Sequence, residues 1–209
     1  MVLSGMRAGW LKTWEERSIL RSVTQGEVRE FVWNALSQAR AAAYPTPPHG
    51  HHPNFVGAGR ASERLMLNPV YLKAETLLAG PDQVLKPLRE AAMKSGKRVI
   101  LPHPDKAGQY VSLEGLHPSQ LKRVRDVARL GQPVLLAETA IDLVLVGAVA
   151  VDETLGWIGK GYGFPYRGLE VAAPWACLAH TLMVFEELPC EPERRMSLIA
   201  TPHQVLTVG

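Results

Sequence analysis

The sequence predicts an α/β protein, a single three-layer α/β/α sandwich built on a mostly parallel sheet with Rossmann-like topology. Two observations lead to this class. Apolar runs typical of buried strands alternate along the chain with amphipathic helical segments, and strand–helix–strand alternation favours parallel pairing through right-handed crossovers. The length of 209 residues suffices for one large domain with a sizeable core, but not for two.

The first predicted helix has a clear start signal. Thr24 is followed three residues later by Glu27, which is the pattern of a capping box. One face of the following segment is apolar and consists of Val28, Phe31, Val32, Ala35, Leu36 and Ala39. Residues 24–209 are predicted to form the domain. Residues 1–23 lack a convincing period and are predicted to be an N-terminal extension, with a short helix at 10–18.

The alternation follows a loop at residues 44–59, where prolines and glycines exclude regular structure. Helices are then predicted at residues 61–67, 82–96, 118–131 and 167–173. Strands are predicted at residues 71–79, 97–102, 141–151, 178–184, 198–201 and 205–208.

Composition and charge set loose limits on location and partners. Acidic and basic residues are interleaved and the net charge is +3, so nucleic-acid binding is not indicated. The longest apolar run, 141–151, is too short to cross a bilayer and contains Asp142, so no membrane association is expected. Only Cys177 and Cys190 are present and no signal peptide precedes them, which predicts a cytoplasmic protein without disulfides.

The stretch LGWIGKGYGFPYRG carries the most specific chemical signal. Gly159, Gly161 and Gly163 alternate, and Lys160 lies between the first two. The glycines are expected where the strand at 141–151 gives way to a helix, a position where free amides and the helix dipole favour anions. The spacing matches neither a Walker A loop nor the dinucleotide motif. Two interpretations therefore stay open, a site for a nucleotide phosphate and a flexible turn.

Several short motifs, in the same order, resemble the 5-formyltetrahydrofolate cyclo-ligase (methenyltetrahydrofolate synthetase) family. The resemblance is closest to its domain-containing branch, which carries VGSVAV, GWRIGKGEGY, IPNFKG and TPTRVIATG. The counterparts here are VGAVAV, GWIGKGYGF, HPNFVG and TPHQVLTVG. The first helix, TQGEVREFVW, is similar to the family's K-x-x-(I/L)-R-x-x-(I/V)-W. The resemblance extends from Thr24 to the end of the chain.

The resemblance implies a cyclo-ligase-like fold that binds a nucleotide and a folate-type small molecule. The reaction uses ATP and magnesium to convert 5-formyltetrahydrofolate into 5,10-methenyltetrahydrofolate, and the protein contributes positioning and charge neutralisation. Together, the loop pattern and the family imply a nucleotide site made of Arg29, Gly159, Lys160, Gly161, Tyr162 and Gly163. The residues expected to contact the folate are Asn54, Phe55 and Trp157, the last by stacking its ring.

The chain departs from the family where this chemistry needs charge. Trp157 stands in the position of a loop arginine, and residues 164–166, Phe-Pro-Tyr, replace a Tyr-Tyr-Asp whose carboxylate is implicated in holding magnesium. Gln25 replaces a lysine that approaches ATP, while Arg29 is retained. The folate-side acid has no clear counterpart, although Asp82 occupies that neighbourhood. Losing one phosphate-binding cation costs about 2–4 kcal/mol of transition-state stabilisation.

These departures leave three hypotheses, and no catalytic residue is assigned. The first is a cyclo-ligase-related enzyme, and the second is a catalytically degenerate module that binds a ligand or partner on the same fold. RNA binding through the basic face at 123–129 is weaker, because Asp126 interrupts it. His49, His51 and His52 fit no standard zinc spacing, so no metal-ligating residue is predicted.

Overall fold

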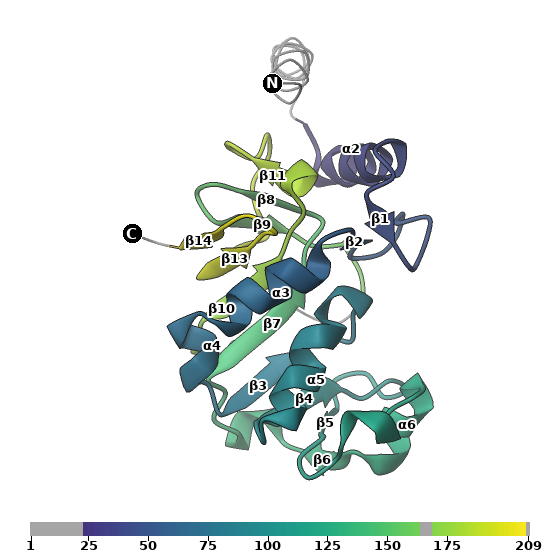
Figure 1. Ribbon diagram of the computed structural model, residues 1–209, viewed down its shortest axis with the longest axis vertical. Coiled ribbons are helices and arrows are strands. Elements are labelled where there is room, and N and C mark those ends of the chain that lie inside the picture. Colours follow the sequence, from purple (N-terminus) through teal and green to yellow (C-terminus); the bar gives the residue numbers. More distant parts are fainter. Residues whose placement is uncertain (1–22, 164–168, 208–209) are drawn as a thin grey trace.

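The computed structural model describes residues 23–163 and 169–207 (Figure 1). The predicted helix at 10–18, and the extension that contains it apart from Val23, lie outside the described residues. The described chain has the predicted α/β fold, in which helices pack on a large, mostly parallel sheet. Val23 is 8% exposed and joins the core just before the first described helix.

The large sheet has eight strands in the order β14-β13-β10-β7-β3-β4-β5-β6. The five strands from β13 to β4 are parallel, and antiparallel strands extend both edges. The central strand β7 is buried along its whole length, as expected for a strand covered on both faces. In chain order the strands are β3 Thr76–Ala79, β4 Arg98–Pro102, β5 Tyr110–Ser112, β6 Gln132–Val134, β7 Leu143–Gly147, β10 Trp175–Leu178, β13 Leu198–Ala200 and β14 Val205–Thr207.

The connectivity creates a topological switch point between β3 and β7. From β3 the chain moves outward to β4, and later it returns to the opposite side of β3 with β7, β10 and β13. The connections therefore leave the carboxyl ends of β3 and β7 in opposite directions. In open α/β sheets such a switch point leaves a crevice where ligands bind.

Five α-helices lie in the described part of the chain: α2 Gln25–Gln38, α3 Ala58–Met66, α4 Pro69–Lys73, α5 Lys86–Lys94 and α6 Val124–Leu130. In Figure 1, α3, α4 and α5 cross in front of the large sheet. The capping box before α2 is confirmed, since the Glu27 amide donates to Thr24 Oγ1 and the Thr24 amide donates to Glu27 Oε2. Short 3-10 turns are η1 Gln83–Leu85, η2 Pro118–Gln120, η3 Leu136–Glu138 and η4 Thr181–Met183.

A second sheet, in the order β11-β8-β9-β12, lies above the first in Figure 1. Its strands are β8 Ala150–Asp152, β9 Gly156–Ile158, β11 Val184–Phe185 and β12 Arg194–Arg195. A two-stranded ribbon pairs β1 Ala42–Ala43 with β2 Asn54–Phe55. The predicted single strand at 141–151 is therefore wrong, because it divides into β7 and β8 in different sheets. Both halves are buried and apolar, so the hydropathy pattern does not reveal the break.

Other predicted boundaries also shift. Residues 71–79 are only partly a strand, because Asn68 caps α4 by accepting from the Val70 amide at 2.9 Å. The predicted helix at 118–131 divides into η2 and α6, and the predicted strand at 178–184 divides among β10, η4 and β11. Of the predicted helix at 167–173, the described part, 169–173, is not helical. The crossover from β7 to β10 thus runs through β8 and β9 instead.

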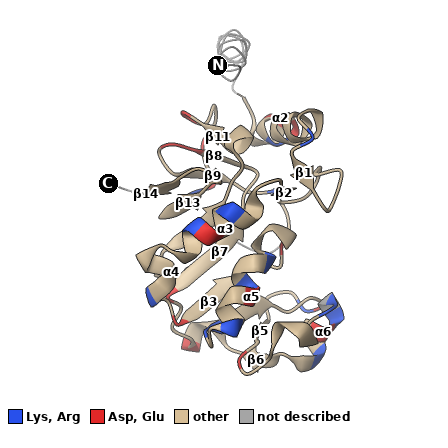
Figure 2. Cartoon of the chain, viewed as in Figure 1, with Lys and Arg blue, Asp and Glu red and all other residues tan. Residues whose placement is uncertain are grey.

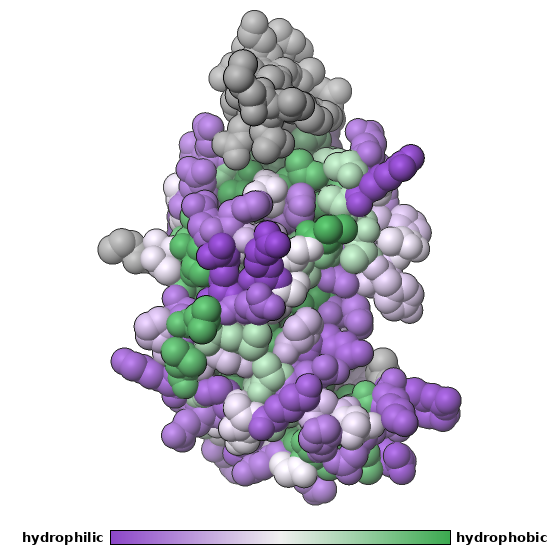
Figure 3. Space-filling model, viewed as in Figure 1, coloured by the Kyte–Doolittle hydropathy of each residue, from purple (hydrophilic) through white to green (hydrophobic). Residues whose placement is uncertain are grey.

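The surface mixes charges and polarity. Figure 2 shows acidic and basic residues interspersed on α3, α5 and α6. The face in Figure 3 is mostly hydrophilic, with apolar side chains exposed around α4, where Leu67 is 76% and Leu72 is 58% exposed. Among the described helices, none combines the length and apolarity needed to span a membrane.

Candidate functional site at the switch point

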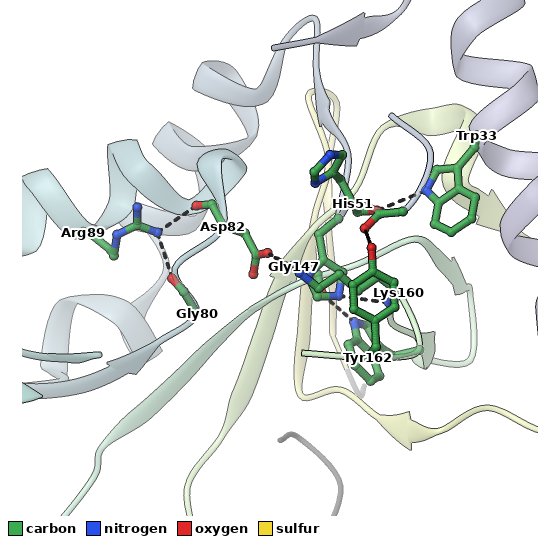
Figure 4. A network of polar contacts seen from close by, with 11 residues as sticks. Trp33, His51, Gly80, Asp82, Arg89, Gly147, Lys160 and Tyr162 are labelled. Carbon is green, nitrogen blue, oxygen red and sulfur yellow. Dashed lines mark hydrogen bonds and ion pairs between the residues drawn. The ribbon is translucent and has the colours of Figure 1, made fainter. Parts of the chain in front are cut away.

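The site is built at the carboxyl ends of β3 and β7. After β3 the chain turns through Gly80 and Asp82, and Arg89 of α5 secures this turn (Figure 4). Its Nη1 donates to the carbonyl oxygens of Gly80 and Asp82, each at 2.8 Å. The Asp82 side chain is thereby held at the switch point.

Asp82 is a buried carboxylate surrounded by nitrogen groups. Its Oδ1 lies 2.9 Å from His52 Nδ1 and 3.8 Å from Lys160 Nζ, and its side chain is 8% exposed. Burial by itself raises the pKa of Asp82, but His52, Lys160 and Arg89 together outweigh it and lower the pKa to about 2. Asp82 is therefore ionised throughout the physiological range and is not suited to donate a proton.

His52 links Asp82 to the loop after β9. The ring is buried, and its Nε2 accepts a hydrogen bond of 3.1 Å from the Lys160 backbone amide. A backbone N–H only donates, so Nε2 carries no proton; the neutral imidazole then holds its proton on Nδ1, facing Asp82. A Cβ on Gly147 would lie 2.5 Å from the His52 ring, which explains the glycine at the end of β7.

Residues 159–163, the glycine loop, follow β9 and take a shape that glycine permits. Gly161 and Gly163 have φ values of +89° and +90°, in the left-handed region. The amides of Gly161, Tyr162 and Gly163 donate no hydrogen bond to another residue of the described chain. Lys160 Nζ lies 5.3 Å from the centre of the Tyr162 ring, so its charge is held beside these amides.

Arg29 of α2 contacts the glycine loop at Gly159 and Gly161. Its Nε donates to the Gly159 carbonyl at 2.6 Å, and a Cβ on Gly161 would lie 3.2 Å from its Cζ. Its Nη2 pairs with Glu193 Oε1 at 2.5 Å and also contacts Gln25. The Arg29 and Glu193 side chains are only 13% and 9% exposed, so this ion pair is largely shielded from water.

Residues 48–52, the histidine loop, join α2 to the glycine loop. Trp33 Nε1 donates to the His51 carbonyl at 3.0 Å, which attaches the histidine loop to α2. Besides the bond at His52, the Tyr162 hydroxyl donates to the Gly50 carbonyl, as Figure 4 shows. Two hydrogen bonds therefore connect the loops, one at the His52 side chain and one at the Gly50 carbonyl.

Comparison with known proteins identifies the family. The sequence profile of the 5-formyltetrahydrofolate cyclo-ligase family matches residues 21–202. The chain belongs to this family. Methenyltetrahydrofolate synthase domain-containing proteins are similar in sequence, at 30% identity in Bos taurus and 29% in Homo sapiens over 90% of this chain. The chain spans about half the length of these curated relatives, 54% in both.

Solved structures of cyclo-ligase relatives share the fold. The 5,10-methenyltetrahydrofolate synthetase of Aquifex aeolicus matches with a TM-score of 0.59 at 18% identity, covering 90% of this chain and 95% of that one. The synthetase of Mycoplasma pneumoniae matches with a TM-score of 0.50 at 12% identity, covering 85% and 98%. At these identities the likeness establishes the fold.

The structure brings together the residues that the sequence assigns to a nucleotide site. Arg29 contacts the glycine loop at Gly159 and Gly161, and whether these residues bind a nucleotide stays a prediction. Their setting differs, however, because the glycine loop follows the antiparallel strand β9 and no helix begins within 169–173. No helix dipole is therefore shown to contribute. The Lys160 amide is also used by His52, so the amides of Gly161, Tyr162 and Gly163 are those without a hydrogen bond to the described residues.

The expected folate contacts are placed differently. Trp157 lies on β9 at 1% exposure and its indole donates to the Gly147 carbonyl at 3.0 Å, so the expectation of an exposed stacking ring in the loop is wrong. Phe55 is 2% exposed and packs against the His180 ring. Asn54 is partly exposed, and its amide donates to the Tyr44 carbonyl at 3.2 Å. Asn54 is thus the residue of this set able to meet a ligand.

Sequence reasoning did not assign His52 and Asp82 to the site. The sequence pattern places His52 in the loop at 44–59 and does not distinguish it from His49 and His51, yet it is buried. Asp82 was noted only by its position. A usable signal existed, since Asp82 follows a strand of a parallel sheet after Gly80-Pro81, where side chains of neighbouring strands meet. The described residues contain no group of three His, Cys, Asp or Glu side chains placed to hold a metal.

Proposed function

We propose that this protein binds the phosphates of ATP at the glycine loop and converts 5-formyltetrahydrofolate into 5,10-methenyltetrahydrofolate. The glycine loop carries the proposal. Left-handed Gly161 and Gly163 flank Tyr162, and successive amides in such a conformation make a concave anion site. Lys160 adds a full positive charge beside them.

The position of the loop supports the same proposal. His52 connects it to Asp82 at the switch point between β3 and β7, which is where α/β sheets bind ligands. The folate would lie on the side of the histidine loop and contact Asn54. The buried Phe55 side chain anchors this part of β2 in the core. We do not retain Trp157 as a folate contact.

The residues fit ATP better than they fit a magnesium ion held by protein alone. The amides of the glycine loop and Lys160 suit phosphate oxygens, whereas Asp82 and Glu193 are already paired with cations. Magnesium would be carried mainly by the nucleotide phosphates, as is usual for this ion. We also propose a cytoplasmic location, because Cys177 and Cys190 are free thiols.

One observation favours a second candidate, a non-catalytic module that binds a nucleotide or another anion. Of the described residues, Arg29 and Lys160 are the cations that contact the loop region, and both have an acidic partner, Glu193 for Arg29 and Asp82 for Lys160. A phosphate must therefore compete with these carboxylates, and less charge is available to stabilise phosphoryl transfer.

One assay separates the candidates. The purified protein is incubated with 5-formyltetrahydrofolate and MgATP while the absorbance of the methenyl product is followed, and ATP binding is titrated separately. Product formation supports the enzyme, and ATP binding without product supports the module. If neither is observed, the enzyme and the nucleotide-binding module both fail.

The Lys160→Ala variant tests the site itself. Removing the charge beside the glycine loop is expected to weaken ATP binding about tenfold, since hydrogen bonds to charged groups contribute about 1.5–3 kcal/mol. Lys94→Ala is the matched control, because Lys94 is exposed at the far end of α5. Equal affinities of the two variants would remove Lys160 from the site.

A further inference from the structure

We infer that His52 is a positioning residue that sets the shape of the glycine loop, with Asp82 selecting the tautomer that does so. The inference depends on the proposed function only for its effect on nucleotide affinity. The structural part concerns the hydrogen bond of the His52 ring with the Lys160 amide and its 2.9 Å contact with Asp82, and it stands independently of any ligand.

The first step concerns the direction of each bond. The Lys160 amide donates to His52 Nε2, so this nitrogen must present its lone pair. Asp82 has a pKa of about 2 and is an acceptor at neutral pH, so it favours a proton on His52 Nδ1. The carboxylate and the amide therefore select the same neutral tautomer from opposite sides of the ring.

The second step concerns the fit of the ring. The His52 side chain is 1% exposed, and the glycines at 147 and 159 provide the space around it. A Cβ at Gly159 would lie 3.2 Å from Nε2 and 2.5 Å from the Trp157 ring. With its faces packed in this way, the imidazole cannot turn away without displacing β7 or β9, and Nε2 is held toward the loop.

The third step concerns the consequence for ligand binding. The bond at Lys160 fixes the backbone immediately before the three amides that we propose bind the phosphates. Fixing the start of the loop reduces the conformational entropy that an anion must remove when it binds. His52 would thus raise anion affinity without touching the anion, and its ring lies between the loop and the switch-point acid, in polar contact with both.

The structural test is NMR of ¹⁵N-labelled wild-type protein at neutral pH. We expect a scalar coupling across the hydrogen bond between the Lys160 amide nitrogen and His52 Nε2, together with imidazole shifts that place the proton on Nδ1. A proton on Nε2, or no coupling, would overturn the inference. Because this measurement needs neither a variant nor a nucleotide, it decides the point even if the proposed function fails.

The functional test uses two substitutions that each keep half of the ring's bonding. In His52→Gln the side-chain carbonyl reaches the position of Nε2 and can still accept from Lys160, whereas in His52→Asn the amide reaches only the position of Nδ1, toward Asp82. We expect ATP affinity to fall about tenfold in His52→Asn, the equivalent of one net hydrogen bond, and less than threefold in His52→Gln. Hydrogen exchange of the Lys160 amide should accelerate in His52→Asn and not in His52→Gln.

The control is His117→Asn, which leaves a good cap residue at η2, away from the site. It should change neither ATP affinity nor exchange at Lys160. Equal losses of affinity and protection in His52→Asn and His52→Gln would show that the ring only fills space, and would contradict a positioning role. If either variant does not fold, the coupling in the wild type remains decisive.

Discussion

The switch-point site and helix α6 both pair acids with cations, but they do so in opposite ways. At α6, Asp126 accepts from the Arg123 amide at 2.8 Å and from Arg129 Nη2 at 3.4 Å, all within three residues, and the Arg129 side chain is 69% exposed. At the switch point, Asp82 is buried, and the His52–Lys160 bond that adjoins it spans 108 residues of sequence. The α6 pairs stabilise one local turn, whereas the buried pairs fix the relative positions of three distant segments.

The difference has an energetic reason. An exposed ion pair is screened by water and contributes little to stability. Removing one member of a buried ion pair leaves the other charged group without a partner where little water can solvate it. Such a change strongly lowers the free energy of unfolding. Substitutions at the two sites should therefore differ strongly in their effect on the free energy of unfolding.

The largest effect is expected for Asp82→Ala. The change removes the acceptor of His52 and the counter-charge of Lys160, so we expect a loss of about 3 kcal/mol in the free energy of unfolding. Guanidinium denaturation at pH 7 measures it. A loss no larger than that of an exposed acid would show that water already solvates Asp82 in the folded protein.

A somewhat smaller loss is expected for Gly147→Ala. The added methyl group would lie 2.5 Å from the His52 ring, and overpacking of this kind costs about 1–3 kcal/mol. Gly59→Ala is the control, because Gly59 lies within α3 and a Cβ there meets nothing within 4 Å. The control should gain about 0.5–1 kcal/mol from helix propensity. A thermal melt in which both variants move in the same direction would contradict the tight packing at Gly147.

The pH dependence of stability should carry the signature of Asp82. Its pKa is lowered from 3.8 to about 2, so the folded state binds the proton less well than the unfolded state. The resulting stability is fully present above about pH 4 and is lost as the pH falls toward 2, and it amounts to about 2 kcal/mol. Comparing acid titrations of the wild type and Asp82→Asn measures this term, and superimposable slopes in that window would argue against it.

The smallest effect is expected for Asp126→Ala. Its bonds to Arg123 and Arg129 are local and Arg129 is exposed to water, although they hold the pKa of Asp126 below its ordinary value, chiefly through the Arg123 amide. Guanidinium denaturation should show a change close to experimental error. If this variant were destabilised as much as Asp82→Ala, the contrast between the two regions would not hold.

Local sequence signals predicted the elements whose cause is local. The capping box at Thr24, the helix ended before Gly96 and the buried strand at 98–102 follow from neighbouring residues, and the structure has all three. The division of 141–151 into β7 and β8 could not be predicted in this way. The break follows Gly147, where the His52 ring approaches the backbone from another part of the chain.

The sequence by itself determined the family, the α/β class and the glycine loop with Lys160, because each resides in the order and spacing of nearby residues. Only the tertiary structure decided that Trp157 is buried, that His52 and Asp82 lie beside the glycine loop, and that Arg29 and Lys160 have acidic partners. The physical reason is that these properties arise from contacts between residues far apart in the chain, where burial and the approach of charges depend on how the strands are ordered.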